Sequence, residues 1–203
     1  MKNPPKLKQK LEVKKYHGIE IKDEYSWIHQ KNILEVLKDS SKLNPEVRKY
    51  LEEENSYTKF QMKDTEQLQK KLFKEIKGRI KLDDESLHFF YNKEGWEYWT
   101  KTTTENNYPI MLRKKIGNNK DKVQEYWNGD KEKKKLKASY FGVGDLSVSH
   151  DHSLLGYSLD LNGSEFYTIY IRRIADEKII DEKIENTSGS ITFSKNSQFI
   201  FYT

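Results

Sequence analysis

The stretch LSVSHDHSLLGYS, residues 146–158, recurs forty-five positions later as ITFSKNSQFIFYT, residues 191–203. Val148 matches Phe193, and Tyr157 matches Tyr202. In each copy, alternating apolar and polar residues flank a short polar turn, which is the period-two pattern of a half-buried β-hairpin. A chain that repeats such a hairpin builds its fold from small sheet units, none of which buries much surface alone.

The residues from position 86 onward read as a succession of short strands, with a hairpin signal at Asn162-Gly163. The predicted strands are LHFFYNK, EYWTKTT, PIMLRKK and KVQEYW, then GDLSVSH, LLGYSLD, FYTIYIRR and KIIDEKI, and finally SITFSK and QFIFYT. Four short strands recurring every 40–50 residues are typical of β-propeller blades. We expect blade 1 at about 86–128, blade 2 at about 141–184 and the start of blade 3 at about 190–203.

These blades predict an incomplete β-propeller of about two and a half blades. A propeller closes by packing its last blade against its first and needs roughly four to eight blades. We therefore expect most of the ring to lie outside these 203 residues.

Residues 1–78 carry helical signals instead. Asn44 is a helix cap followed by Pro45, and apolar residues then recur at helical spacing. A short helix is predicted over 33–38, and another from about 64 to Gly78. The second helix is expected to turn four apolar residues inward: Leu68, Leu72, Phe73 and Ile76. The predicted fold class is α+β, with a helical segment over 1–78 followed by mostly antiparallel β structure over 79–203.

The composition predicts a folded protein with a small hydrophobic core. Apolar and charged residues each make up 34% of the chain, and even with ten Gly added the apolar share stays below the roughly 45–50% of globular domains. Thirteen Tyr, nine Phe and four Trp argue against disorder. The net charge of +5 lies within residues 1–22. A second basic run, KEKKKLK at 131–137, is expected in a surface loop and is more typical of solvated surface than of a nucleic-acid interface.

The sequence contains no cysteine, which excludes disulfides, zinc–thiolate sites and cysteine nucleophiles. It has no apolar N-terminal signal segment and no run near the ~18 apolar residues of a membrane span. We therefore expect a cytoplasmic protein with neither nucleic acid nor membrane as a partner. The sequences NGS at 162–164 and NTS at 186–188 are interpreted as turns rather than glycosylation sites.

Three clusters could carry a function. His150 and His152 could offer imidazoles to a metal, but a site needs a third ligand, so SHDHS is interpreted as a polar turn. The acidic DDE at 83–85 could bind cations or a basic peptide, although a charged connector is the simpler interpretation. The aromatic WEYW at 96–99 could form a ligand platform, although strand alternation favours packing within a blade. We assign no metal or cofactor site.

A serine-peptidase nucleophile on an α/β-hydrolase fold requires a strained Gly-x-Ser-x-Gly elbow. Ser164 follows Gly163 within a predicted hairpin turn, and TSGS at 187–190 lacks both the leading Gly and a strand-to-helix context. No residue of the chain is assigned a catalytic role.

Six blocks of the sequence resemble the N-terminal portion of oligopeptidase B enzymes (protease II), within the prolyl oligopeptidase family of serine peptidases. The blocks are DEYSWI at 23–28, PEVRKYLEEENSYT at 45–58, LFKEIKGRIKLDDES at 72–86, YPIMLRKK at 108–115, GSEFYTIYIRR at 163–173 and IENTSGSITFS at 184–194. The resemblance covers about 23–203, and departs at 29–41 and in the Lys-rich run near 131.

The resemblance implies a two-part enzyme that cleaves short peptides after Arg or Lys. In this family a seven-bladed propeller caps an α/β-hydrolase domain that carries the Ser-Asp-His triad, and the N-terminal helical segment wraps that domain. The triad would then lie beyond Thr203, so this chain alone is expected to be inactive and prone to associate. Two alternatives stay open: a non-enzymatic propeller fragment that binds a partner through exposed strand edges, and one half of a split peptidase completed by a separate chain.

Overall fold

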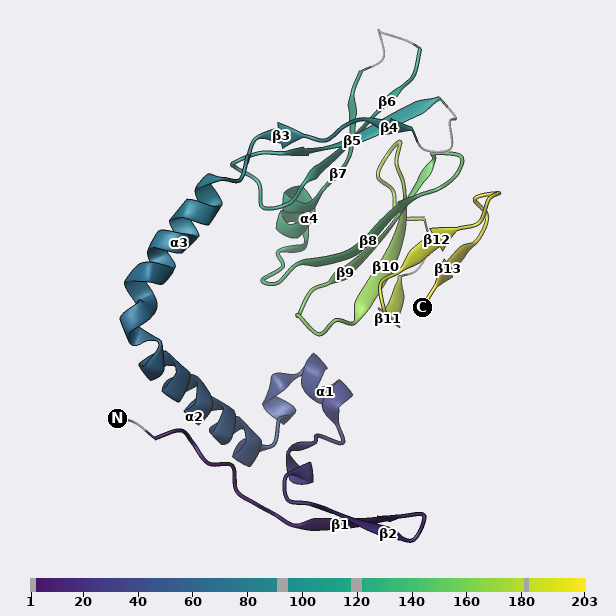
Figure 1. Ribbon diagram of the computed structural model, residues 1–203. Helices are drawn as coiled ribbons and strands as arrows, with labels where there is room; N and C mark the ends of the chain where they lie inside the picture. The colour runs from purple at the N-terminus through teal and green to yellow at the C-terminus, as the bar shows by residue number, and fades with distance from the viewer. Residues whose placement is uncertain (1–2, 91–94, 118–121, 181–182) are drawn as a thin grey trace. The chain divides into compact units, whose positions relative to one another are not determined.

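The computed structural model describes residues 3–90, 95–117, 122–180 and 183–203 (Figure 1). The chain divides into two compact units, Met1–Ile80 and Lys81–Thr203, called here the N-terminal unit and the C-terminal unit. Helices dominate the first unit and antiparallel sheets make up the second, which confirms the predicted α+β fold class.

The predicted helices of the N-terminal unit are confirmed. The helices are α1 (Ile33–Lys38), α2 (Pro45–Gln61) and α3 (Glu66–Gly78), with short 3-10 turns at Ser26–Ile28, Ser40–Lys42 and Lys63–Thr65. The side chain of Asn44 caps α2, because its Oδ1 accepts hydrogen bonds from the backbone N–H groups of Glu46 (2.8 Å) and Val47 (3.4 Å). Pro45 occupies the first turn, where its missing N–H costs nothing.

The expectation that residues 1–78 are wholly helical is wrong near the N-terminus. Strands β1 (Glu12–Tyr16) and β2 (Ile19–Asp23) form an antiparallel hairpin. Its two-residue loop is His17-Gly18, and both residues have positive φ, as the tight hairpin turns that match strand twist require. The Lys-rich sequence hides the strand pattern because none of the strand residues is buried.

The apolar face of α3 is present but is not turned inward. Leu68, Leu72, Phe73 and Ile76 lie on one side of the helix, and each is between 45% and 68% exposed. The sequence therefore predicts the amphipathic helix correctly, whereas no described part of the chain buries its apolar face.

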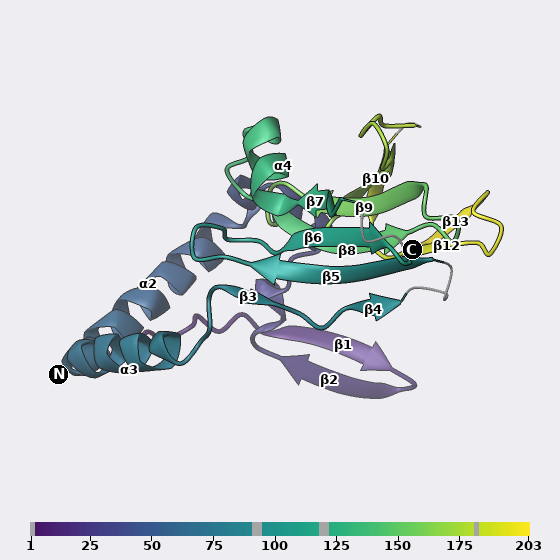
Figure 2. The same ribbon diagram turned by 90° about the horizontal axis from the view of Figure 1, so that it is seen from above.

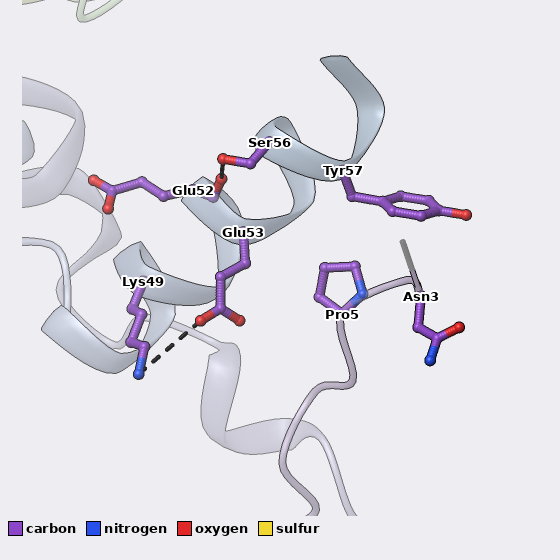
Figure 3. Close-up of a pocket in the computed structure, with 7 residues that line it drawn as sticks. All are labelled: Asn3, Pro5, Lys49, Glu52, Glu53, Ser56 and Tyr57. Carbon is purple, nitrogen blue, oxygen red and sulfur yellow. Dashed lines mark hydrogen bonds and ion pairs between the residues drawn. The ribbon is translucent and has the colours of Figure 1, made fainter. Parts of the chain in front are cut away.

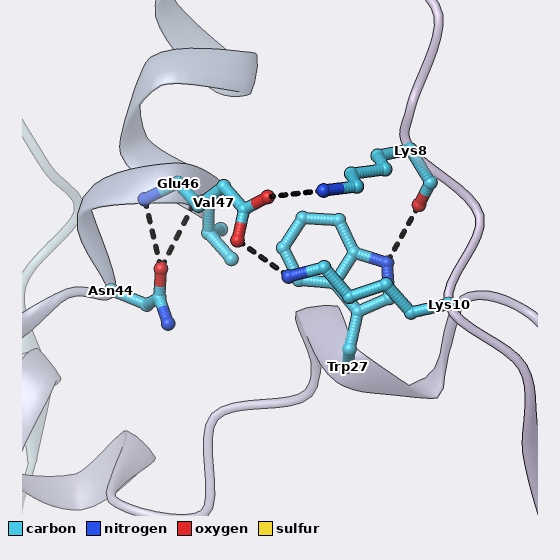
Figure 4. Close-up of polar contacts among 6 residues, drawn as sticks. All are labelled: Lys8, Lys10, Trp27, Asn44, Glu46 and Val47. Carbon is cyan, nitrogen blue, oxygen red and sulfur yellow. Dashed lines mark hydrogen bonds and ion pairs between the residues drawn. The ribbon is translucent and has the colours of Figure 1, made fainter.

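The N-terminal arm is tied to the start of α2 by charge and aromatic contacts (Figure 4). Lys10 Nζ lies 2.5 Å from a carboxylate oxygen of Glu46 and 4.1 Å from the centroid of the Trp27 ring. The indole N–H of Trp27 donates to the backbone oxygen of Lys8 at 2.8 Å. The carboxylate of Glu46 also lies in the first turn of α2, where the helix dipole favours negative charge.

Among the described residues, the C-terminal unit contains a five-stranded and a four-stranded antiparallel sheet, followed by a two-stranded one. Blade 1 comprises β3 (Asp84–Glu85), β4 (Phe89–Phe90), β5 (Trp96–Thr102), β6 (Ile110–Lys115) and β7 (Gln124–Asn128), where β3 and β4 both pair with β5. Blade 2 comprises β8 (Gly142–Val148), β9 (Leu154–Asp160), β10 (Tyr167–Arg173) and β11 (Ile184–Thr187). The last sheet pairs β12 (Ile191–Phe193) with β13 (Ile200–Tyr202).

Two local predictions for this unit are wrong. The run 131–137 is not a loop: α4 (Gly129–Leu136) covers most of it, beside the end of β7 (Figure 2). The side chain of Asn128 caps this helix by accepting from the N–H of Lys131 at 3.1 Å, and acidic residues in the first turn with basic ones in the last suit the helix dipole.

The outermost strand of blade 2 lies later than KIIDEKI predicts. Residues 178–180 make only an isolated bridge between Ile179 and Arg172, and the strand itself spans Ile184–Thr187. Residues 181–182 of that predicted strand, and 91–93 of the first one, lie outside the described residues.

The hydrophobic core of the C-terminal unit lies between blades 1 and 2. Tyr98 of β5, Trp127 of β7 and Tyr157 of β9 are each at most 5% exposed. The full buried cluster is Tyr98, Trp127, Phe141, Val148, Leu155, Tyr157, Leu159 and Ile174. Because residues from both sheets contribute, neither blade has a complete core without the other.

We predict that Asn44→Ala lowers the unfolding free energy of the N-terminal unit by about 1 kcal/mol, because two N–H groups at the start of α2 lose their acceptor. Chemical denaturation followed by far-UV circular dichroism measures the change. Asn32→Ala is the matched control, since Asn32 precedes α1 without a side-chain capping bond. Equal losses in the two variants would contradict the capping role.

Candidate functional site

The two Gly/Ser sequences considered as nucleophile positions are structural turns. Ser164 is 2% exposed, and its Oγ donates to Asn162 Oδ1 at 3.1 Å. The hydroxyl of Ser188 hydrogen-bonds that of Thr203 at 2.5 Å. Each hydroxyl therefore serves the geometry of a loop, and neither lies on a strand-to-helix elbow.

The two histidines of SHDHS follow β8, and only one of them is a surface residue. His152 is 5% exposed, adopts a positive φ of 61°, and its Nδ1 lies 2.8 Å from the hydroxyl of Tyr98 in blade 1. SHDHS is the turn between β8 and β9, as predicted, and within it His152 is also a buried contact between blades. Among the residues that the structure describes, no cluster of three acidic, His or Cys side chains could hold a metal ion.

Two buried arginines cross the boundary between the blades in opposite directions. Arg113 of blade 1 is 4% exposed, and its Nη1 donates to the backbone oxygen of His152 at 2.6 Å. Arg172 of blade 2 is 2% exposed, and its Nη2 donates to the backbone oxygen of Tyr126 at 2.9 Å. Each blade thus supplies one guanidinium to the backbone of its neighbour.

Both guanidinium groups are further held by partners of their own. Arg172 Nη1 lies 2.5 Å from the carboxylate of Glu132 on α4, and its guanidinium carbon lies 5.2 Å from the ring centroid of Trp127. Arg113 donates to Gln124 at 2.8 Å and lies 4.2 Å above the ring of Trp96. Such pairing is what makes a buried charge tolerable.

Sequence reasoning missed these arginines as interface residues. A signal was present in IYIRR, where strand alternation puts Arg172 on the same face as Tyr170, whose ring stacks on that of Tyr157. Burial also affects the aromatic residues around Arg172. Desolvation raises the pKa of Tyr157 to about 12, and the nearby negative charge of Glu132 acts in the same direction.

The aromatic WEYW segment packs within and between blades. Tyr98 and Trp99 are buried on opposite sides of β5, and the ring of Trp99 stacks on His88 with centroids 4.1 Å apart. The blade-packing interpretation is therefore confirmed.

The acidic DDE segment makes ordinary surface contacts within the C-terminal unit. Asp84 pairs with Lys81 at 2.6 Å, and Glu85 pairs with Lys101 of β5 at 3.1 Å. Hydrogen bonds from the side chain and backbone of Thr104 lower the pKa of Asp83. Asp84 and Glu85 form β3, which pairs with β5, so two residues of the predicted connector belong to blade 1.

Hydrogen bonds between side chains of blade 2 and the backbone just before and at the start of β12 hold the β12–β13 hairpin against blade 2. Asp145 Oδ2 accepts from the N–H of Ile191 at 2.9 Å, and Ser158 Oγ donates to the backbone oxygen of Gly189 at 2.7 Å. Gly156 lets the hairpin approach, since a Cβ there would lie 3.1 Å from Ile191 and 3.2 Å from Phe193. These contacts hold β12 against β8 and β9.

The turn after β9 is organised by the carboxylate of Asp160. Its two oxygens accept from the N–H groups of Asn162 and Gly163 at 3.0 Å and of Glu165 at 2.8 Å. Burial alone would raise the pKa of Asp160, but these backbone donors lower it below its ordinary value.

One shallow pocket of about 400 Å³ lies in the N-terminal unit, between the N-terminal arm and α2 (Figure 3). Pro5 faces the ring of Tyr57, and Lys49 lies 4.0 Å from Glu53. Its side chains offer no nucleophile paired with a base, so we assign it no chemistry. In the described part of the chain, no helix combines the length and apolar character needed to cross a bilayer.

Comparison with known proteins identifies the family. A model described as prolyl oligopeptidase, N-terminal beta-propeller domain, matches residues 4–203. The chain belongs to the prolyl oligopeptidase family. It is 32% identical over 212 residues to dipeptidyl aminopeptidase BI of Pseudoxanthomonas mexicana, a match covering 98% of this chain and 28% of that protein. Protease 2 of Moraxella lacunata is 24% identical over 192 residues, which cover 92% of this chain and 26% of the relative.

Solved structures of the prolyl oligopeptidase family agree in fold. Oligopeptidase B from Leishmania major superposes with a TM-score of 0.76 at 22% identity, covering 98% of this chain and 29% of that one. The match to oligopeptidase B from Trypanosoma brucei has the same TM-score and covers 28% of that protein's chain. The predicted partial propeller and the predicted resemblance are both confirmed, and the chain spans little more than a quarter of the length of these relatives.

We predict that Arg172→Met destabilises the C-terminal unit by about 3 kcal/mol or more, because Glu132 is left buried without its partner. Urea unfolding followed by tryptophan fluorescence measures the loss. The double variant Arg172→Met, Glu132→Gln removes the orphaned charge and should recover part of that stability. A double variant no more stable than Arg172→Met alone would contradict the buried ion pair.

We predict that Asp160→Asn costs about 2 kcal/mol near pH 7, because charge-assisted hydrogen bonds in the turn are weakened. The folded-state pKa of Asp160 lies below its unfolded value, so the stabilisation is complete above the unfolded pKa and is lost as the pH falls through the folded one. Urea unfolding should therefore show the variant's deficit at pH 7 shrinking below about pH 4. Asp64→Asn, in an exposed turn, serves as the control. A deficit independent of pH would argue against the carboxylate.

Proposed function

We propose that the chain is the N-terminal and propeller part of an oligopeptidase B-like serine endopeptidase that cleaves short peptides after Arg or Lys. The observation that carries the proposal is the family match over residues 4–203, together with relatives that are named as peptidases. In this proposal the chain restricts access to a hydrolase domain, and the nucleophile, base and oxyanion-stabilising groups come from polypeptide outside the 203 residues.

Two features support a role that depends on further polypeptide. The chain exposes 15301 Å² of surface, whereas two separate compact units of this mass would expose only about 12,000 Å² in total. The apolar face of α3, with Phe73 and Ile76 each more than 60% exposed, contributes to the excess. Large uncovered apolar faces of this kind are typical of interaction surfaces.

A second candidate is a dipeptidyl aminopeptidase, favoured by the higher identity to dipeptidyl aminopeptidase BI, 32% against 24% for protease 2. The two activities differ in the substrate group they require: a dipeptidyl aminopeptidase needs a free α-amine two residues from the cut, whereas an endopeptidase does not. The exposed apolar face of α3 also fits the two alternatives, one half of a split peptidase and a non-enzymatic fragment that binds a partner.

We predict that the purified 203-residue chain hydrolyses neither N-blocked substrates ending in Arg or Lys nor dipeptidyl substrates with a free N-terminus, because no described residue forms an activated nucleophile. Fluorogenic versions of both substrates measure this, with trypsin as a positive control for the first. Turnover by the pure chain would overturn the assignment.

The polypeptide that completes the enzyme decides between the two specificities. If the coding sequence continues past codon 203, or if an adjacent frame encodes the remainder, the combined product should cleave the N-blocked Arg and Lys substrates. Cleavage confined to substrates with a free N-terminus would favour the dipeptidyl aminopeptidase instead. Hydrolysis of neither by a folded combined product would contradict both.

A further inference from the structure

A pocket of about 270 Å³ lies at the boundary between blades 1 and 2, and we call it the inter-blade pocket. Phe89 of β4, Tyr98 of β5 and Tyr126 of β7 line it from blade 1, and residues 145–148 of β8 line it from blade 2. Sites for drug-sized ligands enclose roughly 300–1,000 Å³. The inter-blade pocket is smaller, so it suits a single side chain.

The blade 1 side of the pocket is aromatic. The rings of Phe89 and Tyr98 have centroids 6.0 Å apart and planes 27° apart, whereas Tyr126 meets Tyr98 edge to face at 5.5 Å. Phe89 is 49% exposed and Tyr98 is 2% exposed, so this wall runs from the solvent into the core. Its inner part is poorly hydrated, since burial raises the pKa of Tyr126 and the neighbouring Tyr98 acts in the same direction. Such a wall favours an aromatic ring, because ring pairs at these separations attract each other beyond the burial of apolar area.

The blade 2 side of the pocket is a strand edge. Side chains of a strand alternate between its faces, yet consecutive residues of β8 line the pocket, so the pocket follows the backbone. Ser149 N–H donates to the backbone oxygen of Leu154 at 3.0 Å, which makes these residues a hydrogen-bonded pair that continues the β8–β9 ladder. Because such pairs alternate, the backbone groups of Leu146 and Val148 point away from β9. Among the described residues, no strand pairs with β8 on that side.

The carboxylate of Asp145, which also lines the pocket, is already committed to the fold. Its Oδ1 accepts from the N–H of Leu146 at 2.8 Å, and its Oδ2 accepts from the N–H of Ile191 at 2.9 Å. The pocket therefore does not select a cation. A free aromatic molecule would fill the space but leave the backbone groups of Val148 unpaired, whereas an extended peptide with an aromatic side chain would satisfy both.

We propose that the inter-blade pocket binds an extended peptide, which inserts an aromatic side chain beside Phe89 and Tyr126 and pairs its backbone with Val148. This is strand addition to a sheet edge, where backbone bonds give affinity and a side-chain pocket gives specificity. The inference rests on the proposed function in one respect, because the peptide would be a substrate of the proposed peptidase. It adds a preference for an aromatic residue, separate from the Arg or Lys at the cut.

The test titrates the full 203-residue chain, isotope-labelled for NMR, with the heptapeptide GSTFTSG blocked at both ends. The matched control peptide, GSTATSG, lacks only the aromatic ring. The amide signal of Val148 should shift saturably, with the first peptide binding at least tenfold more tightly than the second. Equal binding of the two peptides, or no binding of either, would overturn the proposal.

A third peptide separates strand addition from simple filling of the pocket. GSTFTSG methylated at its three central amide nitrogens keeps the ring but loses the N–H groups that a strand needs for pairing. It should bind at least tenfold more weakly than the parent peptide. Equal affinity of the methylated and parent peptides would contradict the pairing with β8.

Two matched variants locate the binding. Phe89→Ala removes one wall of the pocket, and because Phe89 is 49% exposed the fold is retained, which far-UV circular dichroism checks. This variant should weaken binding of GSTFTSG at least tenfold. Phe60→Ala, at a residue of α2 that is also 49% exposed, is the control and should leave binding unchanged. Unaltered binding by Phe89→Ala would refute the site.

These readouts are independent of catalysis. A chain that prefers GSTFTSG, but whose combined product hydrolyses no peptide, would keep this inference and lose the proposed function. An active combined product whose isolated chain does not distinguish GSTFTSG from GSTATSG would do the reverse.

Discussion

The C-terminal unit depends on two guanidinium groups that are buried at the boundary between blades 1 and 2. Arg113 reaches from blade 1 to the backbone oxygen of His152, and Arg172 reaches from blade 2 to that of Tyr126 and to Glu132. A buried cation without partners is far more costly than one that is paired. Each blade therefore needs the other, not only to complete an apolar core but to satisfy a charge that it cannot satisfy itself. The exchange also fixes how the sheets align, because a shift of either blade would break both contacts.

The boundary between blade 2 and the β12–β13 hairpin is of a different kind. It has no buried cation among the described residues; Asp145 and Ser158 bond to backbone groups next to the inner strand, and Gly156 allows close packing there. The outer half of the same boundary is a groove of about 590 Å³, lined by Ile171, Ile184 and Phe199 among others. The hairpin is thus held through the contacts of β12 with β8 and β9, and among the described residues no strand pairs with the outer edge of β13. Buried arginines with their partners hold blades 1 and 2 together, whereas the hairpin packs on blade 2 along only part of their boundary.

Sequence patterns predicted the elements whose signals are local. Period-two alternation located most strands, and Asn44 with Pro45 located the start of α2. The failures have physical causes. The β1–β2 hairpin has no buried residue to produce an alternating pattern, and the Lys-rich α4 depends on a cap at Asn128 and on charges placed at its ends. His152 could not be recognised as buried, because its partner Tyr98 is fifty-four residues away in another sheet. No catalytic residue was predicted, and the described turns around Ser164 and Ser188 offer no activated nucleophile.

The two units leave apolar surface uncovered in different ways. The face of α3 carries a stripe of Leu68, Leu72, Phe73 and Ile76, each between 45% and 68% exposed. Between blade 2 and the β12–β13 hairpin, the uncovered surface is instead a groove lined by Ile171, Ile184 and Phe199 among others. Burial of either surface would stabilise the fold roughly in proportion to the apolar area removed from water. The helix stripe and the groove are therefore the parts of the described chain where additional apolar contacts would stabilise it most.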